Sequence, residues 1–240
     1  KSRAIVGESI TQRCFPFLFL AAFFIWIFIF FPFLRGKLAL TDDAVPYFDH
    51  VRFFIDHLNA GVFPLWDYAE SNGVPNEFFL IRIGAFNPFY FFMLILKKMG
   101  ASDLHSFYAF LSIYFFIGMM GFYSLAKRII HDKVLAFIAM ALFMFSSFST
   151  FLFSSFLILL FTPMVWFFFF LFSFIKKPTR LYFFGMTFTL MLVLTAYLPF
   201  YFVTIAGVFS LFCGIVLFKE TKEGVATLIK FARNNKLFVC

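Results

Sequence analysis

Charged residues are scarce in this chain. Asp, Glu, Lys and Arg make up 13% of its 240 residues, whereas hydrophobic residues make up 63%. Because a soluble domain typically carries about 25% charged residues, this composition cannot supply a water-soluble surface. The apolar residues, which include 48 phenylalanines, fall into several runs of roughly the 20 residues that one membrane-spanning helix needs. The sequence therefore predicts an integral membrane protein with an all-α fold.

Cysteines and nucleotide-binding motifs are also few or absent. Cys14, Cys213 and Cys240 are too few and too scattered for a disulfide framework. The sequence contains no glycine-rich nucleotide loop and no G-x-S-x-G motif, which argues against a nucleotide site and a serine hydrolase. The net charge of +8 would suggest nucleic acid for a soluble protein. In a membrane protein, however, Lys and Arg collect in cytoplasmic loops, so we expect no nucleic-acid partner.

Hydropathy predicts a polytopic transmembrane helical bundle of about six spans within one transmembrane domain. The first apolar run is longer than the roughly 7–15-residue core of a signal peptide and no cleavage site follows it, so we expect it to stay in the membrane. The second carries Gly118 and Gly121, which suit close helix contacts. Two runs of double length are split, one in the hydroxyl-rich stretch 146–155 and one at Pro199, which has no N–H. The predicted spans are residues 14–34, 104–126, 134–151, 156–175, 181–197 and 200–218.

The distribution of charge predicts the orientation. With the N-terminus in the cytoplasm, the cytoplasmic segments hold 14 of the 20 basic and four of the 12 acidic residues, which is the positive-inside pattern. Segment 83–96 is short for a span, and its crossing would place the basic clusters outside. We therefore interpret it as interfacial or re-entrant, with Lys97 and Lys98 at the lipid headgroups. Residues 35–103 then form a long first extracytoplasmic loop that holds the other eight acidic residues.

The ends of the chain suggest a larger protein. The sequence starts at Lys1 without a methionine and ends in the apolar stretch KLFVC. We expect residues 1–240 to be the N-terminal part of one transmembrane domain in a longer chain.

The outer loop is predicted to begin with an amphipathic helix at residues 44–59. Its apolar side chains recur at helical spacing, and Gly61 is placed to end it. His50 and His57, seven residues apart, would lie about 10 Å from each other along this helix, so we do not expect them to share a zinc ion. The apolar stripe comprises Phe48, Val51, Phe54, Ile55 and Leu58.

Asp42 and Asp43 stand immediately before this helix. One of them can cap it, because a carboxylate accepts hydrogen bonds from the free N–H groups of a helix N-terminus and complements the helix dipole. A cap needs one carboxylate, so the other is a candidate base or cation ligand. Crowding by a neighbouring carboxylate should raise one of the two pKa values, which suits a base.

The next stretch, GVFPLWDYAESNGVP, is predicted to be a structured turn region because glycine and proline punctuate it. Trp66 is a candidate interfacial anchor. Asp67 and Glu70 add two carboxylates, and Arg82 is a possible phosphate contact. These residues could simply be a solvated loop, or they could form a surface that binds a sugar or a phosphate.

The order of motifs resembles a known family. A first transmembrane helix, an acidic pair, the pattern GxxPLWD…GxP and then NPF are similar to the polytopic membrane glycosyltransferases of the GT-C type, in particular the bacterial YfhO-like branch. The resemblance covers the first loop well and the remaining spans only as a hydropathy pattern. The residues that carry it are Asp42, Asp43, Tyr47, Gly61, Pro64, Leu65, Trp66, Asp67, Gly73, Pro75, Asn87, Pro88 and Phe89.

The resemblance implies a multi-pass protein of the bacterial inner (plasma) membrane that transfers a sugar from a polyprenyl-phosphate-linked donor to an extracytoplasmic acceptor, which could be a cell-envelope glycan, teichoic acid or protein. In this family an aspartate of the first outer loop is the catalytic base or helps to hold a divalent cation, Mg²⁺ or Mn²⁺. Carried over, both roles fall on Asp42 or Asp43. The expected substrate-binding residues are Tyr47, Trp66, Asp67, Glu70 and Arg82.

Two other classes of protein stay open. A transporter or a flippase for lipid-linked sugars would also be polytopic, but such proteins tend to place ionisable residues or broken helices inside the membrane. The predicted spans hold essentially no charges before their ends. A non-catalytic membrane protein would not need eight acidic residues in one loop.

Overall fold

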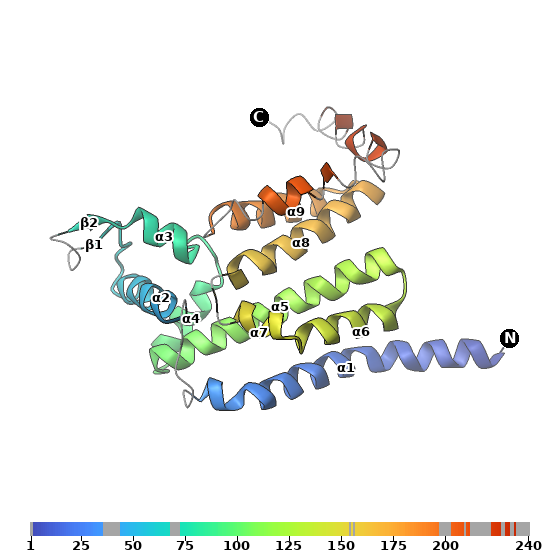
Figure 1. Ribbon diagram of the computed structural model, residues 1–240, viewed down its shortest axis with the longest axis horizontal. Coiled ribbons are helices and arrows are strands. Elements are labelled where there is room, and N and C mark those ends of the chain that lie inside the picture. Colours follow the sequence, from blue (N-terminus) through green and yellow to red (C-terminus); the bar gives the residue numbers. More distant parts are fainter. Residues whose placement is uncertain are drawn as a thin grey trace.

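The computed structural model describes residues 2–35, 44–67, 73–153, 155, 157–196, 203–208, 210–211, 222–226, 229–230 and 233. Within these residues the chain is mostly helical, and its strands form one two-stranded sheet (Figure 1). The elements are α1 (Ser2–Leu34), α2 (Ala44–Asn59), β1 (Trp66–Asp67), β2 (Val74–Pro75), α3 (Glu77–Ile83), α4 (Tyr90–Lys98), α5 (Asp103–Ile130), α6 (Lys133–Met144), α7 (Ser147–Phe153), α8 (Leu157–Lys176) and α9 (Arg180–Leu194).

Two helices of the described part, α5 and α8, are long and apolar enough to cross a membrane. The pair α6 and α7 gives a third candidate span, although the two helices are bent by 64° relative to each other. In α1 and α9 the apolar stretches are shorter than 18 residues. The fold is thus helical with two or three candidate spans, and the count of six stays a prediction whose last span, 200–218, lies largely outside the described residues.

The first of the double-length runs breaks where predicted, between the end of α7 at Phe153 and the start of α8 at Leu157, and a second time inside the predicted span 134–151. A single helix was predicted over 134–151, whereas α6 ends at Met144 and α7 begins at Ser147. The hydroxyl of Ser146 donates to the carbonyl of Phe143 at 2.7 Å, and the hydroxyl of Ser149 donates to the carbonyl of Met144 at 2.5 Å. These hydroxyls bond to carbonyls in the last turn of α6, where the helical hydrogen-bond pattern ends, so the chain can bend in apolar surroundings.

The contact between α5 and α8 forms the centre of the bundle. A Cβ atom on Gly118 would lie 2.6 Å from Oγ1 of Thr162, and one on Gly121 would lie 2.8 Å from Nε1 of Trp166. Thr162 and Trp166 donate hydrogen bonds of 3.1 and 3.0 Å to main-chain carbonyls of α5. The predicted role of the two glycines in close helix contact is therefore confirmed. The contacts also show that α5 and α8 run parallel, because Thr162 and Trp166 meet α5 in the same chain order; α6 and α7, which come between them in the sequence, lead the chain back.

The elements of residues 44–98 gather at one end of the bundle, and the turn between α5 and α6 lies at the other (Figure 1). The helix predicted over 44–59 is present as α2 with the same bounds. Its buried side includes Val51, Phe54 and Ile55. Segment 83–96 is not one helix, because Gly84 adopts a left-handed conformation (φ 63°) that ends α3 before α4 begins at Tyr90.

Candidate functional site

A small hairpin organises the motif PLWD…GVPN. Trp66 pairs with Pro75 and Asp67 with Val74 in an antiparallel register. Gly73 has a φ of 104°, and a Cβ atom there would collide with the indole of Trp66. Because a positive φ and a close approach both favour glycine, Gly73 lets the indole of Trp66 lie against the main chain of residue 73.

Asn76 anchors this hairpin to the chain before it. Its side chain is 2% exposed, and its Nδ2 donates to the carbonyl of Pro64 at 2.9 Å. Its main-chain N–H donates to the carbonyl of Leu65, also at 2.9 Å. The asparagine therefore holds both ends of the motif together from a buried position.

The motif NPF has a local structural role as well. The buried side chain of Asn87 accepts a hydrogen bond of 3.1 Å from the N–H of Phe89, and the N–H of Asn87 donates to the carbonyl of Gly84 at 2.8 Å. Such asparagine-centred turns lead the chain into a new direction. Here they connect α3 to α4 and position Tyr90 at the start of α4.

A buried pair of tyrosines joins α2 to α4. Tyr47 is 1% exposed, and its hydroxyl lies 3.3 Å from that of Tyr90, which donates to the carbonyl of Ile83 at 2.5 Å. Burial raises the pKa of both hydroxyls above the usual value, so both stay protonated and can donate. Tyr47, which the sequence suggested as a substrate contact, thus lies in the core of the loop region.

An ionic cluster connects α2, α4 and the start of α5. Lys97 donates hydrogen bonds to the carboxylates of Asp56 and Asp103, the latter at 2.7 Å. The Nε atom of Arg52 lies 3.9 Å from Asp56 and 3.7 Å from Asp103. The side chain of Lys97 is 20% exposed and paired with these carboxylates, and its predicted position at the lipid headgroups stays a prediction.

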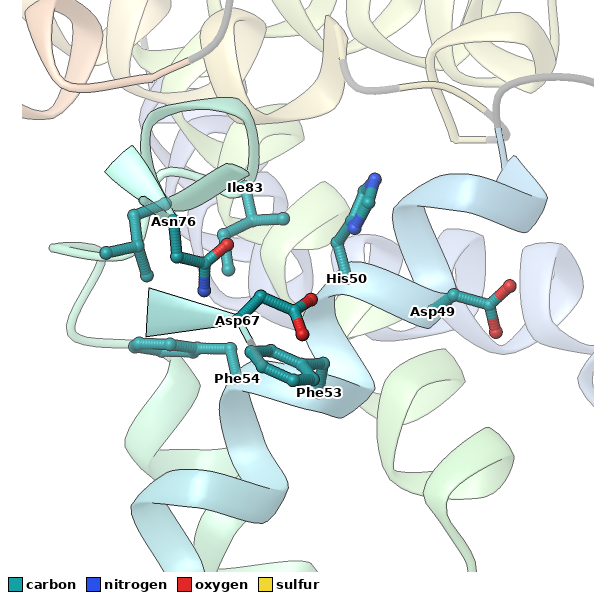
Figure 2. Close-up of a pocket in the computed structure, with 8 residues that line it drawn as sticks. Asp49, His50, Phe53, Phe54, Asp67, Asn76 and Ile83 are labelled. Carbon is teal, nitrogen blue, oxygen red and sulfur yellow. The ribbon is translucent and has the colours of Figure 1, made fainter. Parts of the chain in front are cut away.

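A second group of polar side chains at this end surrounds a cavity of about 200 Å³ (Figure 2). Figure 2 shows the side chain of Asp67 extending from β1 toward the part of α2 that carries His50, whereas the carboxylate of Asp49 points away from Asp67. The polar lining combines two carboxylates, an imidazole and an amide beside two aromatic rings. The lining residues are Asp49, His50, Phe53, Phe54, Asp67, Asn76, Leu80 and Ile83.

The predicted site residues have different positions relative to this cavity. Asp67 lines it. Trp66 packs over Gly73 in the hairpin, and Arg82 lies in the last turn of α3, outside the set of lining residues. Tyr47 is in the core, as described above. Asp42, Asp43 and Glu70 lie outside the described residues.

Three polar residues of the cavity did not figure in the predicted site. Asp49 and His50 follow each other on α2, and Asn76 follows β2. Their positions on the polar side of the amphipathic helix and next to the GxP motif were the available signals. The pairing of α2 with the hairpin depends on contacts between distant parts of the chain, which no local pattern specifies.

In the part of the chain that the structure describes, no group of three or more His, Cys, Asp or Glu side chains could hold a metal ion. The pair Asp42 and Asp43, for which the divalent cation was predicted, is outside that part. The metal prediction therefore stays a prediction.

Comparison of the chain with protein-family models, characterised proteins and solved structures finds no match. The resemblance to GT-C glycosyltransferases accordingly rests on the sequence motifs alone. In this fold Gly73 and Asn87, which carry part of that resemblance, have the structural roles described above.

Proposed function

We propose that this chain is the N-terminal part of a polytopic glycosyltransferase of the bacterial plasma membrane. The protein moves a sugar from a polyprenyl-phosphate donor to an acceptor outside the cytoplasm, such as an envelope glycan, teichoic acid or protein. Its N-terminus is cytoplasmic, it spans the membrane several times, and the end of the bundle that carries α2, α3 and α4 faces outward.

The observation that carries this proposal is the cavity next to the start of α2. Binding sites for small molecules are typically concave and mostly apolar, with a few converging polar groups, and this cavity combines the Asp67 carboxylate, the His50 imidazole and the rings of Phe53 and Phe54. Carboxylates and amides bond to hydroxyl groups, and aromatic rings cover the apolar faces of a sugar. The chemistry of the lining is thus suited to a sugar.

The acidic pair is close to this cavity along the chain. α2 starts at Ala44, directly after Asp43, and Asp49 lies about 8 Å farther along the helix axis, given a rise of about 1.5 Å per residue. In the proposed reaction the carboxylate of Asp42 or Asp43 takes the proton of the acceptor hydroxyl. The acceptor oxygen then bonds to the anomeric carbon as the bond between sugar and phosphate breaks, and the lipid phosphate leaves with the electron pair. A Mg²⁺ or Mn²⁺ ion held by the pair would neutralise that phosphate.

The proposal is tested by transfer of a labelled sugar from a polyprenyl-phosphate donor, with the full-length protein in proteoliposomes. Asp42→Asn and Asp43→Asn should each be made, and at least one should lose activity by about 100-fold or more, which is the usual contribution of a general base. Asp132→Asn is the matched control, because Asp132 caps α6 at the opposite end of the bundle and asparagine caps as well as aspartate. Full activity in both test variants would contradict the catalytic assignment.

The bend between α6 and α7 favours one alternative, a flippase or transporter. Broken helices near the membrane midplane are common in transporters, and this pair is bent by 64°. The hydroxyls of Ser146 and Ser149 are, however, bonded to main-chain carbonyls beside the bend, and are not held ready for a solute. Movement of labelled donor lipid across proteoliposomes without sugar transfer would favour this alternative.

A further inference from the structure

The end of the bundle opposite the loop region carries a cavity of about 400 Å³ surrounded by basic side chains. It lies where α5 and α8 end and α6 begins. Five of its eight lining residues are lysine, arginine or histidine, and none of the eight is acidic. They are Tyr123, Ser124, Lys127, Arg128, His131, Lys133, Phe169 and Lys176. We propose that this cavity binds the phosphate of an anionic phospholipid headgroup.

Three basic side chains of this cavity have no counter-charge among the described residues. Among the described residues, neither Lys127, Arg128 nor Lys133 forms an ion pair, and the buried Nε of Arg128 has no hydrogen-bond partner. The adjacent carboxylate of Asp132 is bonded to the N–H groups that open α6, at 2.7 and 2.8 Å. A buried guanidinium N–H without a partner is costly, and a phosphate oxygen is the acceptor that arginine binds best.

The cavity forms where α5, α6 and α8 meet, so its basic residues come from several elements of the fold and not from a single loop. His131 takes a left-handed conformation (φ 63°) at the end of α5, and Nζ of Lys176 donates to its Nε2 at 3.1 Å. This bond ties the end of α8 to the turn between α5 and α6. Lysines at the ends of α5 and α8 are favoured by the helix dipoles, but Lys133 lies in the first turn of α6, where a cation is disfavoured. The ammonium group of Lys133 therefore adds positive charge to a cavity that the other basic side chains already make positive.

The aromatic walls of the cavity favour a lipid over a free phosphate. Tyr123 precedes Lys127 by one turn of α5, and Phe169 precedes Lys176 by two turns of α8, so the aromatic walls lie about 6 to 10 Å deeper along the helices. Since α5 and α8 are the two helices of the described part that could each cross a membrane, the basic groups lie at headgroup level and the rings lie toward the acyl chains. Basic pockets of this kind between membrane helices bind anionic headgroups. This inference rests on the membrane placement of α5 and α8 and is independent of the proposed transferase.

The test is retention of lipid by the full-length protein in neutral detergent micelles, measured by native mass spectrometry with added phosphatidylglycerol or phosphatidylcholine. Micelles are used because they have no charged bilayer surface. The test variant combines Arg128→Gln with Lys133→Gln. The control combines Lys177→Gln with Arg180→Gln, which removes the same charges near the same end but outside the cavity.

We expect the unmodified protein and the control to retain phosphatidylglycerol in preference to phosphatidylcholine. The test variant should bind phosphatidylglycerol about 30-fold more weakly, because each basic group near an anionic headgroup contributes about 1 kcal/mol. Inorganic phosphate should not displace the lipid at comparable concentration. If the test variant does not fold, Lys127→Gln with Lys176→Gln, both exposed, takes its place. Equal retention by test and control variants, or displacement by inorganic phosphate, would overturn the proposal.

Discussion

At one end of the bundle Lys97 is bonded to the carboxylates of Asp56 and Asp103, whereas at the other end Lys176 bonds, among the described residues, to the imidazole of His131. The first end joins two basic and two acidic side chains into an ionic cluster between α2, α4 and the start of α5. The second gathers basic side chains around a cavity with no acidic residue in its lining. Lysines at the ends of helices thus have carboxylate partners at one end of the bundle and an imidazole partner at the other. At the loop end Lys97 holds elements together, and at the opposite end the basic side chains are proposed to bind an anion from outside the chain.

The same comparison bears on orientation. Cytoplasmic segments of membrane proteins collect Lys and Arg, and the end with the basic cavity is the one predicted from the sequence to face the cytoplasm. α5 and α8 run parallel, because α6 and α7 lead the chain back before α8 begins. The basic residues in the last turns of α5 and α8 therefore lie at the same end of the bundle. In the proposed orientation this basic end faces the cytoplasm.

The largest expected effect comes from the contact between α5 and α8 at the centre of the bundle. Gly121→Leu should lower the stability by about 3 kcal/mol, because the new side chain must occupy the space of the Trp166 indole and overpacking of this kind strains the core. The measurement is the thermal unfolding midpoint of the purified protein, followed by tryptophan fluorescence. Gly207→Leu is the control, since a Cβ atom there meets nothing within 4 Å. Equal midpoints for the two variants would contradict the close packing of α5 and α8.

A smaller and more local loss is expected from the hairpin at the loop end. Gly73→Ala should cost about 2 kcal/mol, from the positive φ and from the collision with Trp66. Gly61→Ala should cost only about 1 kcal/mol, because Gly61 has a φ of 77° but open space around it. Urea unfolding in mild detergent compares the two, and the larger cost at residue 73 reports the collision together with its φ of 104°. If Gly61→Ala costs as much as Gly73→Ala, the indole does not lie over residue 73.

The smallest effect is expected from the ionic cluster. Lys97→Met should destabilise the loop end by about 1 kcal/mol, because partly exposed ion pairs are weakened by solvent, and protection of α2 amides from hydrogen exchange should fall accordingly. Lys98→Met is the matched control, since Lys98 is exposed and forms no ion pair among the described residues. Equal exchange in the two variants would contradict the role of the cluster.

The pH dependence of this effect has a definite sign. Burial lowers the pKa of Lys97, but hydrogen bonds to Asp103 and Asp56 outweigh it, so the pKa lies above its usual value of 10.5. A group whose pKa is raised by folding contributes its full stabilisation below the unfolded pKa and loses it as the pH rises through the folded one. Protection of α2 should therefore decline above about pH 10.5 in the unmodified protein and less so in Lys97→Met.

Local patterns were sufficient for much of the helical structure. The period of apolar residues predicted α2 with its observed bounds, and Gly118 and Gly121 were correctly assigned to a close helix contact. The break after Met144 was not predicted, because it depends on serine hydroxyls bonding to particular carbonyls. An apolar run that contains several serine and threonine residues can break at more than one of these residues, so the sequence pattern does not specify which.

The cavity at the loop end could be predicted only in part. Asp67 was recognised from its motif, whereas Asp49, His50 and Asn76 meet it through the packing of α2 against the hairpin. Tyr47 carries part of the family resemblance, but its buried contact with Tyr90 joins residues 43 positions apart. Partners so distant in sequence follow from the tertiary fold and leave no local signal.

The most direct test of the account is the side of the membrane on which each end lies. In a protein whose three cysteines are replaced by serine, Val62→Cys places a thiol at an exposed position of the loop end, and Lys177→Cys places one near the opposite end. An impermeant maleimide applied to intact cells should label Val62→Cys and should reach Lys177→Cys only after permeabilisation. Labelling of both variants in intact cells, or of Lys177→Cys alone, would contradict the proposed orientation and with it the outward-facing site.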